Sequence, residues 1–546
     1  MNILFSLLSL FMISQKADLI LYNGKIMTMN NNLPYVEALA IRGNKIIAIG
    51  FDEEILRLKK QNTKIINLKK RLALPGFNDT HLHFLSGGES LFILNLNKKN
   101  EEQIKEDLRI KVKETRKGEW IEGRGWDQYY FKNRKFPTKR LLDKVAPDNP
   151  VILRRVGGHI ILVNSKALEL AGINKDTVSP PGGEIIHYKN GEPTGLLKEN
   201  ATDLIYSIMP KTDFNKAKKY ILKALEQTKK YGITSIQDNS SLLALKVYKY
   251  LYRKGKLNLR ISFWGDFNKT PAENMKVKNS FRGYNPKKLK FGIIKGFIDG
   301  TLGARTAKMF FPYADKPDTS GLFTIDIDNL FKKVTEFDKN GFQIGFHAIG
   351  DYGVWMALES FKIARIKNGL RDSRHRIEHS QTVREEDLNT YKNLGIIASV
   401  QPAHMIYDSI WAEKRLGKKR MKEAYRWKSF VDKEIPIAFG TDWPIVPLNP
   451  MIGIYAAVTR KNLKGFPLGG WNSEEKLSVC QVLKYYTYGG AYASFDENLK
   501  GTLEPGKLAD IIVLSKDITE LPPSEILQTK VEMTIFDGKI IYKIKK

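Results

Sequence analysis

Two histidines stand one residue apart in the string LPGFNDTHLHF, which runs from Leu74 to Phe84. On a β-strand, side chains at positions i and i+2 point to the same face, so His81 and His83 would present two imidazoles side by side. Such a pair can chelate a metal ion. Two unrelated histidines near a loop are the alternative, and the string alone does not separate the two interpretations.

Four further residues able to bind a metal or move a proton follow other apolar runs. They are Lys295 in IIKGFIDG, His347 in FHAIGD, His379 in RIEHSQ and Asp442 in FGTDWP. Each has an ordinary explanation by itself, such as a hydrogen-bonded histidine, a surface lysine or a turn-forming aspartate. If the runs are strands of a parallel barrel, however, their carboxyl ends meet at one mouth, and these residues converge there.

The middle of the chain alternates β-branched apolar runs with helical stretches, which is typical of a parallel α/β sheet or barrel. Nine runs qualify as strands, one more than an eight-stranded barrel holds. We assign VILRRV (151–156) to an insertion at about 87–231, a long charged segment. The remaining strands are expected at 72–81, 232–238, 259–265, 291–298, 342–348, 375–380, 396–401 and 435–442.

Both ends of the chain predict parts of one small β-sandwich. The N-terminal segment from Ala17 to Gly50 is typical of short strands joined by Asn-Gly and Gly-Asn turns, and the strings GTLEPGKLADIIVLS and VEMTIFDGKIIYKI have the same character. We therefore expect an α/β protein. A (β/α)8 TIM barrel would occupy 74–495, with the halves of the sandwich at 17–73 and 496–546.

An apolar run from Ile3 to Ile13 precedes the first expected strand. It fits the core of a signal peptide within residues 1–16 and is too short to span a bilayer. We expect an exported protein, periplasmic or secreted, if this segment is a signal peptide, and a cytoplasmic protein otherwise. The absence of Lys or Arg before Ile3 weakens the signal-peptide interpretation. No transmembrane segment is expected elsewhere.

The formal net charge of +30 is spread over lysines along the whole chain. Because no basic helix or aromatic-interleaved stripe is recognisable, we expect a solvated surface and no nucleic-acid partner. The single cysteine, Cys480, excludes an internal disulfide framework and a cysteine-based zinc site. Any metal must therefore be bound by His, carboxylate or a modified side chain.

The order of the candidate residues resembles the amidohydrolase superfamily of metal-dependent hydrolases. PGFNDTHLH at the end of the first barrel strand is followed by Lys, His, His and Asp in the strand order of that superfamily. Longer strings narrow the resemblance to the amidohydrolase-3 branch, which includes N-substituted formamide deformylase: GRGWD, GGHIILVNSKAL, IKGFIDGTLGARTA, HAIGD, IEHSQ and GTDWP. The resemblance covers essentially the whole chain after about Ala17.

The resemblance implies one or two divalent metal ions, expected to be zinc. The implied ligands are His81, His83 and Asp442 for one ion, and His347 and His379 for the second. Lys295 would bridge the two ions after carboxylation of its amine, because an ammonium group offers three donors and no acceptor.

The chemistry implied by the resemblance is attack of a metal-activated water on an amide carbonyl. Asp442 would accept the proton and deliver it to the leaving amine, and His379 would stabilise the oxyanion if the second metal site is empty. Nucleobase deaminases of the superfamily typically place Glu three residues after a strand histidine, whereas HAIGD has Gly350 there. Amide hydrolysis is therefore favoured over deamination.

Further residues of the matching strings are expected to line the pocket: His159, Trp126, Asp127, Asp299, Arg305 and Gln381. Packing, a turn or the protein surface are the alternative roles of these side chains. His187 and His404 are expected to be structural, although His404 follows the seventh strand and can reach the mouth. His375 begins its strand and is expected at the opposite end of the barrel.

We expect an enzyme that hydrolyses a non-peptide C–N bond of a small molecule, such as an N-substituted amide. The alternatives are a deaminase or cyclic-amide hydrolase of the same fold, and a non-catalytic binding or regulatory protein that uses its basic surface. The ligand set favours an enzyme, because a scaffold freed from catalysis has no physical need for six converging ligands. The sequence leaves homo-oligomerisation open.

Overall fold

The computed structural model describes residues 16–155 and 160–545, which form two compact units. Unit 1 contains the described residues up to Gly87 and from Ala224 onward, and unit 2 contains Gly88–Lys223. The apolar run before residue 16 lies outside the described residues, so its interpretation as a signal peptide stays a prediction. No helix of the described residues is both long and apolar enough to cross a bilayer.

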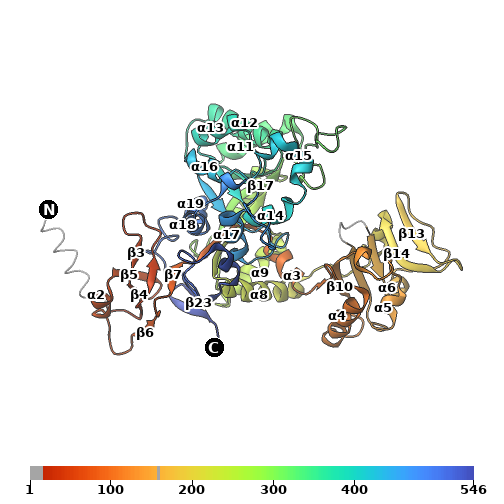
Figure 1. The fold of residues 1–546 in the computed structure, drawn as a ribbon, viewed down its shortest axis with the longest axis horizontal. Helices are drawn as coiled ribbons and strands as arrows, with labels where there is room; N and C mark the ends of the chain where they lie inside the picture. The colour runs from red at the N-terminus through yellow and green to blue at the C-terminus, as the bar shows by residue number, and fades with distance from the viewer. Residues whose placement is uncertain (1–15, 156–159, 546) are drawn as a thin grey trace. The chain divides into compact units, whose positions relative to one another are not determined.

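Eight parallel strands form the barrel of unit 1 (Figure 1). In sheet order they are β8 (Phe77–Leu82), β15 (Ile233–Asp238), β16 (Arg260–Asp266), β17 (Leu289–Phe297), β18 (Ile344–Ala348), β19 (Arg376–His379), β20 (Ile397–Val400) and β21 (Ile437–Phe439). The barrel closes where the backbone N–H of Asp442 donates to His81 O at 2.6 Å and that of His83 donates to Trp443 O at 2.8 Å. The predicted TIM barrel is confirmed.

Helices follow most of the barrel strands. They are α8 (Phe214–Lys230), α9 (Leu242–Arg253), α10 (Pro271–Asn279), α11 (Ile327–Lys339), α12 (Asp351–Asn368), α13 (Glu385–Leu394), α14 (Pro402–Asp408), α15 (Ala412–Met421), α16 (Trp427–Asp432), α17 (Pro450–Thr459), α18 (Val479–Lys484) and α19 (Gly490–Ala493). In α11, the Asp326 side chain caps the N-terminus. Leu330, Val334 and Phe337 then recur every three or four residues, so one face of this helix is buried.

The first expected strand, 72–81, is two strands in the structure. β7 (Leu72–Pro75) belongs to the sandwich, β8 belongs to the barrel, and Gly76 separates them. A Cβ atom at position 76 would lie 2.2 Å from Oγ1 of Thr234, so a larger residue would clash where the chain passes from the sandwich to the barrel. The expectation of one continuous strand is therefore corrected.

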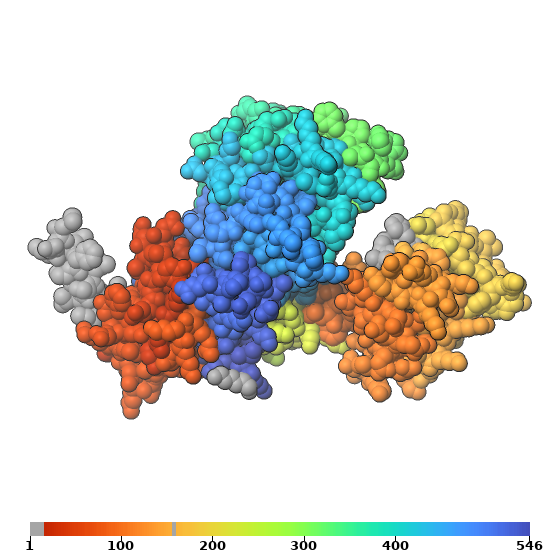
Figure 2. All heavy atoms as spheres, in the orientation of Figure 1, coloured from red at the N-terminus to blue at the C-terminus, as the bar shows by residue number. Residues whose placement is uncertain are grey.

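The sandwich consists of two sheets. One contains β5 (Lys45–Gly50), β4 (Ala38–Arg42), β1 (Leu19–Tyr22) and β6 (Lys64–Asn67), and the other contains β24 (Lys539–Lys543), β23 (Val531–Phe536), β22 (Ile511–Leu514), β7, β2 (Lys25–Met27) and β3 (Tyr35–Val36). The central pair of the second sheet joins the two ends of the chain, with Leu74 opposite Ile512. In Figure 2 the C-terminal atoms, in blue, accordingly lie against the N-terminal atoms, in red. The predicted sandwich from both termini is confirmed.

One of the predicted turns connects two different sheets. The chain passes at Asn23-Gly24 from β1 in one sheet to β2 in the other. Gly43-Asn44 and Asp537-Gly538 instead close the antiparallel hairpins β4–β5 and β23–β24. The two sheets share a core of apolar side chains that includes Leu21 and Ile41 from the first sheet and Ile511 and Ile535 from the second.

A buried ion pair joins the barrel to the sandwich within unit 1. Arg260, on β16, donates from Nε and Nη2 to the two carboxylate oxygens of Asp510 at 2.6 and 2.8 Å. Nη2 also donates to Asp537, in the hairpin turn, at 3.1 Å. The Arg260 and Asp510 side chains are each 4% exposed, so their charges depend on one another.

Unit 2 is built around one six-stranded sheet. Its strands, in sheet order, are β13 (Gly183–His187), β14 (Pro193–Glu199), β12 (Ile160–Val163), β11 (Val151–Arg155), β10 (Ile121–Trp126) and β9 (Leu94–Asn95). The accompanying helices are α4 (Glu101–Glu114), α5 (Arg140–Asp143), α6 (Ser165–Leu170) and α7 (Asp203–Tyr206). Residues 151–155 of VILRRV, which we assign to the insertion, form β11 in this sheet.

Candidate metal centre

His81 is fixed by a hydrogen bond on the side of its ring that faces the barrel interior. It lies near the end of β8, is 1% exposed, and its Nδ1 is 2.8 Å from Oε2 of Glu378 on β19. Burial acts to raise the pKa of Glu378, but Arg376 and His81 overcome that effect and lower it. Because the carboxylate is ionised, it accepts the Nδ1 proton, and Nε2 of the neutral ring keeps its lone pair.

Glu378 is itself held by a network of buried polar groups. Arg376 pairs with Glu378, and its Nη2 also donates to Thr80 O and to Oγ of Ser399 at 2.7 Å each. Oγ of Ser399 donates to Oε2 of Glu378 at 2.7 Å. The buried carboxylate of Glu378 is thus paired with Arg376, and it fixes the orientation of His81.

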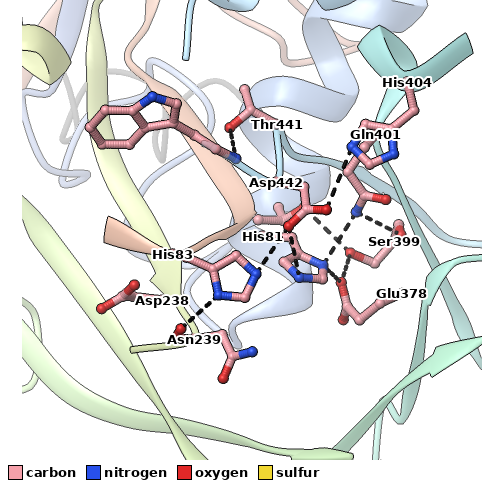
Figure 3. Close-up of polar contacts among 12 residues, drawn as sticks. His81, His83, Asp238, Asn239, Glu378, Ser399, Gln401, His404, Thr441 and Asp442 are labelled. Atoms are coloured by element: carbon pink, nitrogen blue, oxygen red, sulfur yellow. Dashed lines mark hydrogen bonds and ion pairs between the residues drawn. The ribbon is translucent and has the colours of Figure 1, made fainter. Parts of the chain in front are cut away.

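His83 follows β8 and is oriented in the same way by a different acceptor. Its Nδ1 lies 3.0 Å from the carbonyl oxygen of Asn239, which can only accept, so Nδ1 carries the proton. Its Nε2 lies 3.1 Å from Oδ1 of Asp442, and Nε2 of His81 lies 3.6 Å from the same oxygen (Figure 3). With neutral rings, three lone pairs therefore face one another, an arrangement that a cation would satisfy.

The loop after β21 delivers Asp442 to this position. Thr441 donates to Asp79 from its backbone N–H at 2.9 Å and from Oγ1 at 2.6 Å, which ties the loop to β8. A Cβ atom on Gly440 would lie 2.6 Å from the backbone nitrogen of His81, so the loop passes β8 at the distance that glycine allows. Asp442 has a φ of 61°, and such left-handed backbone in a non-glycine residue often accompanies a functional position.

The three remaining predicted ligands lie on consecutive strands. Lys295 on β17 is buried, His347 is on β18, and His379 ends β19 with a φ of 74°. The ring centroids of His347 and His379 are 4.4 Å apart, and those of His379 and His81 are 5.0 Å apart. The structure therefore brings these histidine rings into one cluster at the carboxyl ends of the strands.

Burial sets the protonation state of this cluster. It lowers the pKa of His81 to about 4 and that of His347 to about 3, with Lys295 adding to both shifts. The pKa of His379 is also lowered, first by burial and then by His347 and His81. For His83, burial acts in the same direction, but the contact with Asp442 overcomes it and raises the pKa. Neutral imidazoles are the form that binds metals.

A comparison of the whole sequence with known families gives a match over residues 64–542 to a model described as Amidohydrolase family. The chain belongs to the amidohydrolase family. The resemblance seen in the sequence is thereby confirmed. The putative amidohydrolase YtcJ of Bacillus subtilis is 32% identical to this amidohydrolase over 533 residues, which cover 96% of this chain and 99% of that protein.

Two other relatives carry more descriptive names. N-substituted formamide deformylase of Arthrobacter pascens is 23% identical over 549 residues, covering 97% of this chain and 99% of that protein. The crystal structure of an uncharacterized metal-dependent hydrolase from Pyrococcus horikoshii has a TM-score of 0.75 and 31% identity, covering 92% of this chain and 99% of that one. This amidohydrolase accordingly shares its fold with that metal-dependent hydrolase.

The side chains at the mouth of the amidohydrolase barrel fit a bound metal. Among the described residues, four buried side-chain atoms of this region have no hydrogen-bond partner: Nζ of Lys295, Nδ1 of His379, Nε2 of His404 and Oδ1 of Asp442. Buried polar atoms are nearly always paired, so several orphans at one place indicate a missing partner. His81, His83 and Asp442 form one group of mutually close ligand atoms.

His404 is the member of the cluster that the sequence analysis placed among the structural histidines. It lies in the first turn of α14, after β20, and its Nε2 is 3.5 Å from Oδ2 of Asp442 (Figure 3). With His379 and Asp442 it forms a second group of close ligand atoms. The signal in the sequence was its place shortly after the seventh strand in VQPAHM.

Several predicted pocket residues have structural contacts instead. Trp126 is 1% exposed in the core of unit 2 and donates from Nε1 to Leu153 O at 2.8 Å. Its predicted substrate contact stays a prediction. The neighbouring Asp127 caps a short 3-10 helix and pairs with Arg155. His159 lies outside the described residues, and its role stays a prediction.

The remaining pocket candidates position loops of the amidohydrolase mouth. Asp299 accepts hydrogen bonds from three backbone N–H groups, two of them from Ile349 and Gly350 after β18. Arg305 pairs with Asp315, and Gln381 is buried and donates from Nε2 to Asp408 at 2.8 Å. Their predicted contacts with substrate remain predictions, and their observed contacts support a positioning role.

His375 lies at the start of its strand, as expected. Its Nε2 is 3.0 Å from Asp338 of α11, and its Nδ1 accepts from the backbone N–H of Ile344, the first residue of β18. His187 lies on β13 of unit 2. Neither histidine belongs to the two groups of close ligand atoms found among the described residues.

Proposed function

We propose that this amidohydrolase cleaves the amide bond of a small N-substituted amide, using a divalent cation, expected to be zinc, held by His81, His83 and Asp442. The observation that carries the proposal is the convergence of Nε2 of both histidines with Oδ1 of the aspartate. A bound cation polarises a carbonyl oxygen and lowers the pKa of water. The similarity to N-substituted formamide deformylase supports the amide as the substrate class.

Asp442 and His379 are the residues placed to handle protons and charge. Burial acts to raise the pKa of Asp442, but His81, His83 and His404 overcome it and lower the pKa to about 2. Asp442 is therefore ionised at neutral pH and free to accept a proton, which it would deliver to the leaving amine. If the second metal site is empty, neutral His379 would donate a hydrogen bond to the developing oxyanion.

The loop after β18 favours hydrolysis of an amide over deamination. A deaminase-type glutamate would have to occupy position 350, three residues after His347. A Cβ atom there would lie 2.1 Å from the carbonyl oxygen of Lys308, so the backbone leaves no room for any larger side chain. The backbone N–H of Gly350 is also used, because it donates to Asp299 at 2.8 Å.

Carboxylation of Lys295 is part of the same proposal for a form with two cations. Burial lowers the pKa of this amine to about 8, against the pull of Glu378 and Asp442, and Nζ has no hydrogen-bond partner. A neutral amine adds to carbon dioxide and releases one proton, which leaves an anionic carbamate. The lowered pKa supplies the neutral amine that this reaction needs.

The function is tested by turnover of a substrate panel on zinc-loaded protein. The panel contains N-substituted formamides, acylated amino acids, cyclic amides and, as the competing class, amino-substituted nucleobases. We expect amine release from an N-substituted amide that stops with chelator and returns with zinc. His81→Ala with His83→Ala should abolish both zinc binding and turnover. Turnover of nucleobases alone, or unchanged zinc content in the double variant, would contradict the proposal.

A further inference from the structure

Phe297 is an exposed aromatic side chain at the carboxyl end of a buried strand. It is the last residue of β17 and is 45% exposed, although the four residues before it are buried. Apolar surface that stays in water forgoes the free energy that its burial would supply. The ring therefore offers unused apolar surface at the mouth of the barrel, where the candidate metal centre lies.

The alternation of side chains along β17 turns this ring toward the candidate metal centre. Phe297 and Lys295 are two residues apart, so their side chains share one face of the strand. Lys295 is buried, and its Nζ lies 5.0 Å from the centroid of the Phe297 ring. The ring accordingly lines the inner side of the mouth, one step beyond Lys295 toward solvent.

His347, a predicted metal ligand, packs against the same ring. It is the partner of Phe297 in the pairing of β17 with β18. The two ring centroids are 5.5 Å apart, and the ring planes are inclined by 35°. Phe297 itself has no atom that can bind a metal or move a proton. A molecule whose carbonyl group reaches the predicted ligands is, however, brought beside its ring.

Hydrogen bonds hold the backbone at Phe297. The N–H of Ile298 donates to His347 O at 3.0 Å, and Oγ1 of Thr324 donates to Phe297 O at 3.0 Å. The N–H of Thr324 also donates to Ile298 O at 2.9 Å. Because the ring stands on a fixed strand end, little conformational entropy is lost when a ligand packs against it.

Apolar side chains are also exposed in the loops that follow three of the barrel strands. Phe311 and Leu322 follow β17, Ile410 follows β20, and Ile445 follows β21. Exposed apolar surface of this kind is common where proteins bind ligands. We propose that Phe297 determines specificity by packing against an apolar N-substituent of the amide substrate. A polar substituent would lose water there without gaining a hydrogen bond from the ring.

This inference rests on the proposed function, because it names the substituent that the same site accepts. It is tested on zinc-loaded protein with N-pentylformamide and N-(4-hydroxybutyl)formamide, which differ only in a terminal methyl or hydroxyl group. We expect kcat/KM in wild type to be higher for the pentyl compound by about 10-fold or more. In Phe297→Ser the two values should become nearly equal, whereas Phe297→Leu should keep most of the preference because its side chain is still apolar.

A ligand that is not cleaved gives a second readout. N-hydroxy-N-pentylformamide is a hydroxamic acid that can chelate zinc, and calorimetry measures its affinity relative to that of N-hydroxy-N-methylformamide. We expect the pentyl compound to bind wild type more tightly by about 10-fold or more, and this difference to be lost in Phe297→Ser. Zinc per chain, measured by mass spectrometry, should not change, because Phe297 has no ligand atom.

Two further variants control for folding and for position. Phe297→Gln keeps more of the side-chain volume, so it gives the same readouts if Phe297→Ser is poorly folded, as judged by circular dichroism. Phe51→Ser removes an exposed phenylalanine from the sandwich. It should keep the wild-type preference in both turnover and binding.

Three results would overturn the inference. They are equal kcat/KM for the two formamides in wild type, an unchanged preference in the folded polar variants at position 297, and loss of zinc from those variants, which would mean that the ring holds the ligands instead. Failure of the proposed function looks different. Tighter binding of the pentyl hydroxamate that requires Phe297, without turnover of any amide, would contradict the function and leave the apolar contact standing. Turnover of both formamides at equal kcat/KM would do the reverse.

Discussion

Hydrogen bonds at Nδ1 decide which nitrogen of each histidine faces Asp442. For His81 the partner is Glu378, which can be exchanged by mutation, whereas for His83 it is a backbone carbonyl. The tautomer of His81 therefore depends on the side chain of Glu378, which is distant from His81 in the sequence but adjacent to it in the barrel. Partners of this kind orient the ring and raise its basicity as a ligand.

Glu378→Gln is expected to weaken zinc binding about 10- to 100-fold, because the amide holds the Nδ1 proton of His81 less strongly. Competition with a fluorescent chelator measures the affinity. Glu385→Gln, which removes an exposed carboxylate at the start of α13, is the control and should bind zinc as wild type does. Equal affinity in the two variants would remove Glu378 from its positioning role.

Gly350 offers a second test at the scale of one residue. Gly350→Ala should lower the free energy of unfolding by roughly 1–3 kcal/mol, because the new methyl group meets the backbone of Lys308. Urea denaturation measures the loss. Gly469→Ala is the matched control, since no atom lies within 4 Å of a Cβ there, and it should change the stability little. A wild-type value for Gly350→Ala would refute the steric argument against a glutamate.

The sequence predicts individual ligands where strand position and residue type agree. His81 and His379 lie at strand ends, and a strand end can be recognised from the apolar run before it. His404 could not be assigned in this way, because its direction depends on where α14 begins and how its first turn is oriented. For Trp126, a string shared with a family does not reveal whether the side chain packs in a core or contacts substrate.

Elements at the amino-terminal end of the barrel are held by Asp338. This residue of α11 contacts His375, Arg371 and Asn368, which all precede or begin β19. Burial acts to raise its pKa, but the hydrogen bonds from His375 and Asn368 and the charge of Arg371 overcome it and lower the pKa to about 2. These contacts therefore depend on the ionised carboxylate of Asp338.

The pH dependence of stability follows from that shift. Because the folded pKa of about 2 lies below the ordinary aspartate value of 3.8, the contribution of Asp338 is complete above about pH 4 and is lost as the pH falls towards 2. Asp338→Asn should cost roughly 2 kcal/mol at pH 7, and the difference from wild type should shrink at low pH. Urea denaturation across pH measures both. Asp318→Asn, at an exposed position, should show no such trend.

Helices and strands could be predicted where the spacing of apolar residues agreed with the turn-forming residues on either side of the run. Five of the eight barrel strands lie within the expected ranges, and β16 and β17 overlap theirs with one or two residues outside. The first differs because the expected strand runs across Gly76. Only the packing of Thr234 against that glycine reveals the change of sheet. The Asn-Gly turn at Asn23 likewise does not specify whether the next strand pairs with the previous one.

At the scale of the whole molecule, Arg260 couples the barrel to the sandwich. Arg260→Leu should destabilise the protein by about 3–5 kcal/mol, because Asp510 would remain buried without its partner. Replacing both residues by leucine should recover part of that loss, which a double-mutant cycle on urea denaturation would measure. Additive costs would indicate that the pair does not act as a unit.

The split sandwich was predictable because strings at the two ends of the chain share a strand–turn–strand pattern. The pairing of β7 with β22 was not predictable, since the pattern of a β-strand does not specify which other strand it pairs with. The helices and strands of unit 2 carry few of the strings that identify the family. The order of the strands in the sheet of unit 2 was not predicted from the sequence.

The pairing of β7 with β22 also dictates the order in which the protein can be completed during translation. Leu74 and Ile512 are paired neighbours, although about 440 residues separate them. At ~5–20 residues per second, the ribosome needs roughly 20 to 90 s to make that stretch. One edge of β7 stays unpaired for all of this time, directly before the strand that carries His81. The edge can be covered only when the last strands emerge, and an unpaired strand edge favours aggregation.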